Sequence, residues 1–185
     1  GIASVNLASE QLRKGNLYET IVNMGSRYGI KPSELQLEIT ENVLIDRGDD
    51  NILNTLRRCR EAGASIALDD FGTGYATLSH LRDFPLDCIK IDRSFIREIE
   101  KATESAVIVR EMITLAHELG IVVVAEGIEK PQQLEILRDF GCDIGQGFHI
   151  SKPMSVTDLA EWLNSAAGPD RSIPGLDPRA TPLLR

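Results

Sequence analysis

The chain has no long apolar run, few cysteines and no obvious leader. No stretch approaches the roughly 18 apolar residues of a membrane-spanning helix, and no signal-peptide pattern opens the sequence. We therefore expect no membrane contact by this segment, although the parent protein could be membrane-anchored; the scattered cysteines favour a reducing cytoplasm. The three cysteines, Cys59, Cys88 and Cys142, form no CxxC pair, which predicts reduced, buried thiols.

The sequence also lacks an excess of positive charge and several common catalytic motifs. The chain has 20 Lys and Arg residues and 28 Asp and Glu residues, for a net charge of −8. Such a surface repels a phosphate polymer, so we predict no nucleic-acid polymer as partner. The Gly-rich stretch 70–75 is neither a Walker motif nor a GxGxxG motif. The three histidines show no metal-ligand spacing, and there is no nucleophilic Ser or Cys motif.

Length and composition predict one folded domain. The 185 residues are 42% hydrophobic and 26% charged, which is ordinary for a globular protein. Because the chain starts at Gly1 without Met and enters a strand almost at once, we expect a piece of a longer protein. Proline and glycine become frequent from Gly168, so we expect a domain over 1–167 and a Pro/Gly-rich tail over 168–185.

Six short apolar runs each end on a polar residue able to bind a metal or handle a proton. These ends are 20 to 36 residues apart, close to the roughly 30 residues of a strand with its crossover helix. Parallel strands in a barrel bring all their carboxyl ends to one face, where such residues form a single site. The polar ends are Asn6, Glu38, Asp69 with Asp70, Lys90, Glu126 and Gln146.

Helical segments alternate with these runs, and four of them end at a glycine. The expected helices begin near Glu10, at Asp49 or Asp50, at Glu104 and at Pro131, and their terminal glycines are Gly29, Gly63, Gly120 and Gly141. A final helix over about 156–164 should pack back on the sheet. The strands are nearly continuous apolar runs, as in parallel sheets covered on both faces.

We predict an α/β fold of the TIM-type (β/α)8 barrel class, with about six of the eight β/α units. Three explanations account for the two units that the sequence does not show. They precede Gly1, which we favour, or the sheet is open, or a second copy of the chain completes it.

The polar ends include enough carboxylates for a divalent-metal site. Clustered carboxylates repel one another unless cations neutralise them, and with an amide such as Asn6 they suit Mg²⁺ or Mn²⁺. Two such ions would support an in-line displacement at phosphorus, with Lys90 beside the phosphate or the attacking water. The candidate carboxylates are Glu38, Glu41, Asp69, Asp70, Glu126 and Glu129.

Simpler readings of single residues remain open. A single acidic residue at a strand end is more often a helix cap or a turn residue. A functional site is favoured only because such residues recur at the same position of successive β/α repeats. Glu41 and Glu129 lie past the strand ends, so bracing a loop is as good a reading as metal contact. Gln146 could satisfy backbone groups. An enolase-like barrel with Lys90 as base is a further alternative.

The ordered motifs resemble those of the EAL domain, the family of bacterial cyclic di-GMP phosphodiesterases. The resemblance runs from about Ser4 to Trp162. It rests on the stretches 5–7, 37–41, 69–75, 89–92, 125–129 and 146–148, which read VNL, LEITE, DDFGTGY, IKID, AEGIE and QGF.

The resemblance implies hydrolysis of cyclic di-GMP to linear pGpG with Mg²⁺ or Mn²⁺ at a two-metal site. Asn6, Glu38 and Asp69 would bind the first metal. Asp69 would bridge to a second metal that Asp70 and Glu126 also serve. Lys90 would hold or activate the water, Glu129 and Gln146 would support the metal–water network, and Gln146 and Lys90 would contact substrate.

Glu41 would anchor the loop 70–75, which in this family links metal binding to dimerisation, so a homodimer is expected. The Glu-Ala-Leu motif that names the family is absent from the 185 residues. Because its Glu is a metal ligand, we expect weak or no activity from this piece alone. The alternative within the family is a receptor or regulatory module that binds cyclic di-GMP without cutting it.

Overall fold

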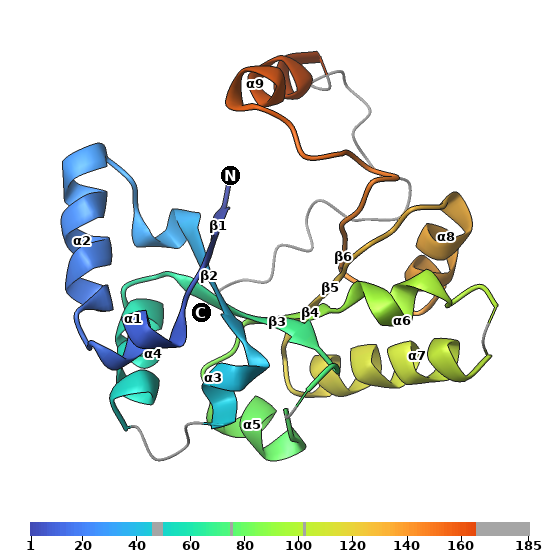
Figure 1. Cartoon of the computed structure of the whole chain (residues 1–185), viewed down its shortest axis with the longest axis horizontal. Helices are drawn as coiled ribbons and strands as arrows, with labels where there is room; N and C mark the ends of the chain where they lie inside the picture. The colour runs from blue at the N-terminus through green and yellow to red at the C-terminus, as the bar shows by residue number, and fades with distance from the viewer. Residues whose placement is uncertain (46–49, 75, 102, 166–185) are drawn as a thin grey trace.

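Six parallel strands form one curved sheet with the strand order β1-β2-β3-β4-β5-β6 (Figure 1). The computed structural model describes residues 1–45, 50–74, 76–101 and 103–165, so the predicted tail 168–185 and its boundary at 167 lie outside the described residues. The strands are β1 (Ala3–Asn6), β2 (Leu35–Thr40), β3 (Ser65–Phe71), β4 (Cys88–Ile91), β5 (Val122–Ala125) and β6 (Ile144–Gly145). Among these residues β1 and β6 are the two edges of a half-barrel, which confirms the predicted partial (β/α) architecture.

Helices follow the strands, as βα repeats require. Figure 1 shows α1, α2 and α4 near the β1 end of the sheet and α6, α7 and α8 near the β6 end. The helices are α1 (Ser9–Arg13), α2 (Leu17–Tyr28), the 3-10 turn η1 (Pro32–Glu34), α3 (Glu41–Ile45), α4 (Asp50–Glu61), α5 (Leu78–Asp83), α6 (Arg93–Arg97), α7 (Thr103–Glu118), α8 (Pro131–Asp139) and α9 (Val156–Ser165).

The strand register separates the sheet into an apolar outer face and a polar inner face. Asn6 pairs with Glu38, Glu38 with Ala67, Ala67 with Cys88, and Lys90 with Val124. Partners in adjacent strands, and residues two apart along one strand, share a face. The residues between them turn outward against the helices.

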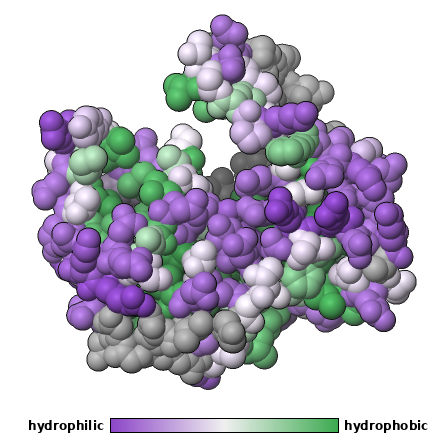
Figure 2. Space-filling view, viewed as in Figure 1, coloured by the Kyte–Doolittle hydropathy of each residue, from purple (hydrophilic) through white to green (hydrophobic). Residues whose placement is uncertain are grey.

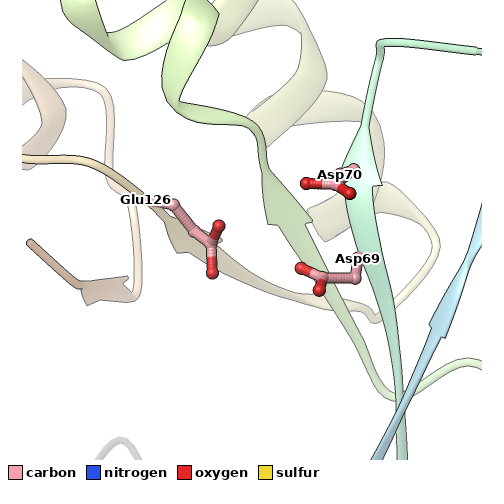
Figure 3. A group of neighbouring side chains, drawn as sticks. All are labelled: Asp69, Asp70 and Glu126. Carbon is pink, nitrogen blue, oxygen red and sulfur yellow. The ribbon is translucent and has the colours of Figure 1, made fainter. Parts of the chain in front are cut away.

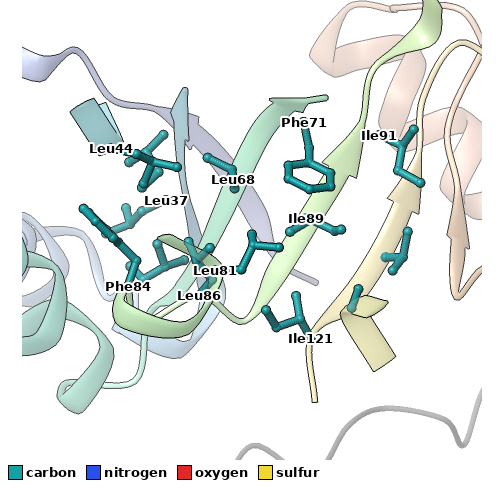
Figure 4. Close-up of a cluster of buried hydrophobic side chains, with 14 of the residues drawn as sticks. Leu37, Leu44, Leu68, Phe71, Leu81, Phe84, Leu86, Ile89, Ile91 and Ile121 are labelled. Atoms are coloured by element: carbon teal, nitrogen blue, oxygen red, sulfur yellow. The ribbon is translucent and has the colours of Figure 1, made fainter. Parts of the chain in front are cut away.

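The outward-facing residues form the main core with the helices. Leu37, Ile39, Leu68, Ile89 and Val123 alternate with the inner-face residues, and each is almost completely buried. Figure 4 shows this layer of hydrophobic side chains crossing β2 to β5. A separate small cluster of Ala67, Cys88 and Val124 lies on the inner face and forms its apolar floor.

The predicted glycine ends are confirmed, but the first helix is interrupted. Gly29, Gly63, Gly120 and Gly141 all have positive φ, from 71° to 109°, a conformation that glycine adopts without a Cβ penalty. The single helix predicted from Glu10 is wrong, because Gly15 takes φ 69° and divides it into α1 and α2.

Two further expectations fail at the margins of the sheet. All four residues of β1 are exposed, so the edge strand is not covered on both faces as its apolar pattern suggested. The final helix was expected to pack back on the sheet. In Figure 1, α9 lies apart from the other helices, and Val156 is 85% exposed and Leu159 42% exposed.

The three thiols are free, and Cys59 and Cys88 are buried as predicted, whereas Cys142 is only partly buried. Burial raises the pKa of Cys59 to about 11 and that of Cys88 to about 12, so both stay uncharged at neutral pH. None of the described helices combines the length and apolar character needed to span a bilayer.

Leu68→Ala should test the outer core, since Leu68 is completely buried on the central strand β3. We expect a loss of about 2–5 kcal/mol in the free energy of unfolding, because the lost methyl groups leave a cavity. Urea denaturation measures it, with Val107→Ala, at an exposed position, as control. Equal stability of the two variants would show that this layer is not tightly packed.

Candidate active site

Lys90 occupies the centre of an acidic cluster on the inner face. Its Nζ lies 2.7 Å from Glu126 Oε1, 3.0 Å from Asp69 Oδ1 and 3.1 Å from Glu38 Oε2. Glu38 stands on β2, Asp69 on β3 and Lys90 on β4, and Glu126 directly follows β5. One ammonium group therefore joins four adjacent segments of the half-barrel.

The charge state of this cluster follows from burial and pairing. Burial by itself lowers the pKa of Lys90, but its interactions with Glu126 and Asp69 outweigh that effect and hold the pKa above its ordinary value. Burial raises the pKa of Glu126, and Lys90 offsets that rise only in part. Lys90 is thus a permanent hydrogen-bond donor at neutral pH, and Glu126 takes up a proton more readily than an exposed glutamate does.

A β-bulge brings two consecutive aspartates to the same site. The pairing of β3 with β4 shifts register between Leu68 and Phe71, and Asp70 has φ 55°. In a regular strand, neighbouring side chains point to opposite faces. The left-handed conformation turns Asp70 toward the side on which Asp69 lies. Burial raises the pKa of Asp70, and the charges of Asp69 and Asp92 raise it further.

Three carboxylates converge closely enough to share a cation. Figure 3 shows Asp69 and Asp70 on β3 facing Glu126 across the inner side of the sheet. One oxygen from each lies within 4.8 Å of the others. Asp69 Oδ1 is buried and accepts no well-aligned hydrogen bond, although it lies 3.0 Å from Lys90 Nζ.

The residues present fit a hard divalent cation. With Glu38, the cluster contains four carboxylates and one ammonium, a formal charge of −3 when all are ionised. Oxygen donors in this number suit Mg²⁺ or Mn²⁺, and the added positive charge would relieve the repulsion among them.

Glu41, predicted as catalytic or as a loop anchor, lies below the loop that follows β3. Its Oε1 accepts a hydrogen bond from Gly72 N at 2.8 Å, and its Oε2 accepts one from Ala76 N at 2.9 Å. The side chain is buried. Both oxygens thus hold backbone N–H groups of the segment beside Asp70, and Glu41 is not among the three carboxylates that converge.

The other predicted residues lie around the cluster. Asn6 shares the inner face with Glu38, its register partner, and is exposed. Gln146 continues the inner face past β6 and is also exposed, while its backbone bonds to Ala125 and Ile128. Glu129 is exposed and lines a neighbouring cavity with Arg93 rather than joining the three convergent carboxylates.

A family model for the EAL domain matches residues 1–153. The chain belongs to the EAL domain family. It is 39% identical over 174 residues to the cyclic di-GMP phosphodiesterase NbdA of Pseudomonas aeruginosa, covering 92% of this chain and 22% of NbdA. This EAL chain thus spans less than a quarter of that relative.

Solved structures show the same EAL architecture. The EAL domain of Mycobacterium smegmatis DcpA superposes with a TM-score of 0.83 at 34% identity, over 89% of this chain and 73% of that one. BlrP1 of Klebsiella pneumoniae, in a manganese and cyclic di-GMP complex, gives 0.69 at 32% identity, over 80% of this chain and 38% of that one.

Sequence reasoning missed Asp92 and Arg93, which follow β4 in this EAL chain. Asp92 caps α6 by accepting a hydrogen bond from Ser94 N at 2.9 Å, and its charge raises the pKa of Asp70. The Asp-x-Ser pattern after a strand was the available signal. Its proximity to Asp70, however, depends on the bulge in β3.

Lys90→Met should test how strongly the carboxylates of the cluster repel one another without the ammonium group. We expect a loss of about 3–5 kcal/mol in the free energy of unfolding at neutral pH, because buried carboxylates lose their counter-charge. Burial already raises the pKa of Glu126, and without Lys90 that pKa should rise further above the unfolded value, so stability should recover as the pH falls. Denaturant titrations between neutral and mildly acidic pH measure this.

Lys101→Met, at an exposed position, is the matched control for Lys90→Met and should show neither effect. In the unsubstituted chain, the raised pKa of Lys90 gives stability the opposite dependence on pH. Its stabilising contribution is full below the unfolded pKa of lysine and is lost only as the pH rises through the folded value. A Lys90→Met variant as stable as the control at neutral pH would contradict this account.

Glu41→Gln should weaken the attachment of Gly72 and Ala76, because an amide offers one acceptor oxygen to their two backbone N–H groups. We expect a loss of about 1–3 kcal/mol and faster hydrogen exchange at Gly72 and Ala76, measured by NMR. Glu61→Gln, at an exposed position, is the control. Unchanged exchange at both amides would show that Glu41 does not hold the loop.

Proposed function

We propose that this chain carries the metal site of a cyclic di-GMP phosphodiesterase and hydrolyses one phosphodiester bond to give linear pGpG. The observation that supports it best is the convergence of Asp69, Asp70 and Glu126 around a lysine-centred cluster in a chain of this family. The dinucleotide specificity is taken from relatives such as NbdA, which this chain matches only in part.

In this proposal the acidic cluster binds Mg²⁺ or Mn²⁺. Asp69, Asp70 and Glu126 would hold the cations, with Glu38 and Asn6 completing the set from β2 and β1. When bound, the cations would neutralise the substrate phosphate and make water more acidic. BlrP1 was solved with manganese and cyclic di-GMP, which supports Mn²⁺ as the first ion to test.

The chain's own residues then have distinct roles. Lys90, held in its charged form, donates hydrogen bonds from Nζ and orients a phosphate oxygen or the attacking water. Glu126 would hold a cation and, through its contact with Lys90 Nζ at 2.7 Å, orient that ammonium group. Glu41 holds the backbone N–H groups of Gly72 and Ala76. Gln146, on the inner face past β6, would contact the substrate, and Glu129 would support bound water.

A non-catalytic receptor is the second candidate function. The observation that favours it is the open half-barrel, in which the described residues surround the cluster only from β2 to β5. In such a module, cyclic di-GMP would bind at the described cluster without being hydrolysed. The proposed homodimer would be tested by sedimentation with and without Mn²⁺.

Asp69→Asn tests the metal site and separates the two functions. We expect Mn²⁺ affinity, measured by calorimetry, to fall at least about tenfold because a charged oxygen donor is lost. Chromatography should detect pGpG from the parent chain with Mn²⁺ and none from the variant. Asp139→Asn, at an exposed position on α8, is the control.

The outcomes of this experiment discriminate clearly. Cyclic di-GMP binding without any pGpG from the parent chain would support the receptor. If neither Mn²⁺ nor cyclic di-GMP binds, both candidate functions are wrong.

A further inference from the structure

Gln133 on α8 is the most deeply buried polar residue in the part of the chain that the structure describes. It is only 2% exposed. Glutamine is mostly found at protein surfaces, because an amide buried without partners costs free energy. A buried glutamine is therefore expected to have its hydrogen bonds satisfied.

Three hydrogen bonds satisfy this amide and connect α8 to two other segments. Gln133 Oε1 accepts from Glu129 N at 2.8 Å and from Lys130 N at 3.0 Å, and its Nε2 donates to Ile96 O at 3.2 Å. These partners fix the orientation of the amide, since its oxygen meets only donors and its nitrogen meets a carbonyl. Gln133 thus joins the segment after β5 to α6.

Both of the joined segments begin beside the acidic cluster. Glu126 opens the segment after β5, and its backbone N donates to Ile91 O at the end of β4 at 3.1 Å. α6 follows Lys90 closely, and Asp92 caps the first turn of that helix. A side chain therefore holds α6 at each end, Asp92 at its start and Gln133 near its end.

The segment after β5 also contacts the start of α6. Gly127 has φ 72°, and a Cβ at this position would strike the side chain of Arg93. The segment is therefore restrained against α6 twice, by close packing at Gly127 and through Gln133 at Glu129. Glu126 lies directly before these restraints.

We propose that Gln133 is a positioning residue for the metal site. By tying the segment after β5 to α6, it fixes Glu126 and Glu129 relative to Lys90 and so raises the affinity of the cluster for a divalent cation. Its three partners are backbone atoms, so it acts through the segment and not by contact with a cation. Residues that orient metal ligands typically change metal affinity about 10–100-fold when substituted. This inference rests on the proposed function, of which the metal site is a part.

Gln133→Glu separates positioning from charge. The substituted carboxylate still accepts from the two backbone N–H groups but cannot donate to Ile96 O, so the link to α6 is lost. An added negative charge should by itself attract a cation and strengthen Mn²⁺ binding. We expect the opposite, a fall of about tenfold in Mn²⁺ affinity measured by calorimetry at neutral pH.

The pH profile and a matched control sharpen this test. Burial raises the pKa of a carboxyl group, and the substituted group, once protonated, can again donate to Ile96 O. The Mn²⁺ affinities of Gln133→Glu and of the unsubstituted chain should therefore approach each other from neutral to mildly acidic pH. Gln132→Glu, at the neighbouring exposed position on α8, should stay within about twofold of the unsubstituted chain, because an exposed charge is screened.

Hydrogen exchange, followed by NMR, tests the same link even if Gln133→Glu does not fold. In the unsubstituted chain without metal, the amides of Glu129 and Lys130 should exchange slowly, because both donate to a buried oxygen. Exchange of both amides at the rate of an unstructured peptide would exclude the link.

The outcomes distinguish this inference from the proposed function. Mn²⁺ affinity in Gln133→Glu equal to or above that of the unsubstituted chain would overturn the positioning role and leave the phosphodiesterase proposal standing. The expected loss of affinity, together with no pGpG from the unsubstituted chain, would support the positioning role and reject hydrolysis. If the unsubstituted chain binds no Mn²⁺, the positioning role and the metal-dependent function are both wrong.

Discussion

A single buried ammonium group holds the inner face of this half-barrel together. Lys90 lies within 3.1 Å of carboxylates from β2, β3 and the end of β5, and nothing else described on that face could balance them at such short range. Buried carboxylates without a counter-charge would disfavour the sheet itself. The same ion pairs fix the positions of the oxygens that face the candidate metal site, so stability and chemistry depend on one interaction.

The outer face provides the stability that the inner face lacks. Hydrophobic residues such as Leu37, Leu68 and Ile89 are buried against the helices, whereas the inner face has only the small floor of Ala67, Cys88 and Val124 below its charges. Figure 2 shows hydrophilic residues over most of the visible face, in keeping with a net charge of −8. The molecule thus concentrates its apolar packing on one side of the sheet.

Much of this arrangement could be predicted, because successive side chains of a strand alternate between the two faces of the sheet. A polar residue at the same phase of each repeat falls on the same face, so the meeting of Glu38, Asp69, Lys90 and Glu126 follows from the spacing of the runs. The helix ends at Gly29 and Gly120 could also be predicted from the sequence, since few residues other than glycine adopt the left-handed conformation of a helix cap.

Features that depend on tertiary contacts were beyond sequence reasoning. The pattern near Glu10 did not show that Gly15 would break the helix, because a glycine within a helix is tolerated at modest cost. Glu41 could equally have been a ligand or a brace until its two hydrogen bonds fixed its place. The cavity beside α6 joins residues of that helix with residues of the segment after β5, and no single motif encodes their proximity.

Asp70 combines two demands that few side chains can satisfy together. Its backbone has φ 55°, a conformation open mainly to glycine, asparagine and aspartate. Its position beside Asp69 and Glu126 also calls for an anionic oxygen. Glutamate would supply the charge but resist the torsion, whereas glycine and asparagine would accept the torsion without the charge. Aspartate alone among the common amino acids meets both conditions, which leaves this position very little room to vary if the metal site is to be kept.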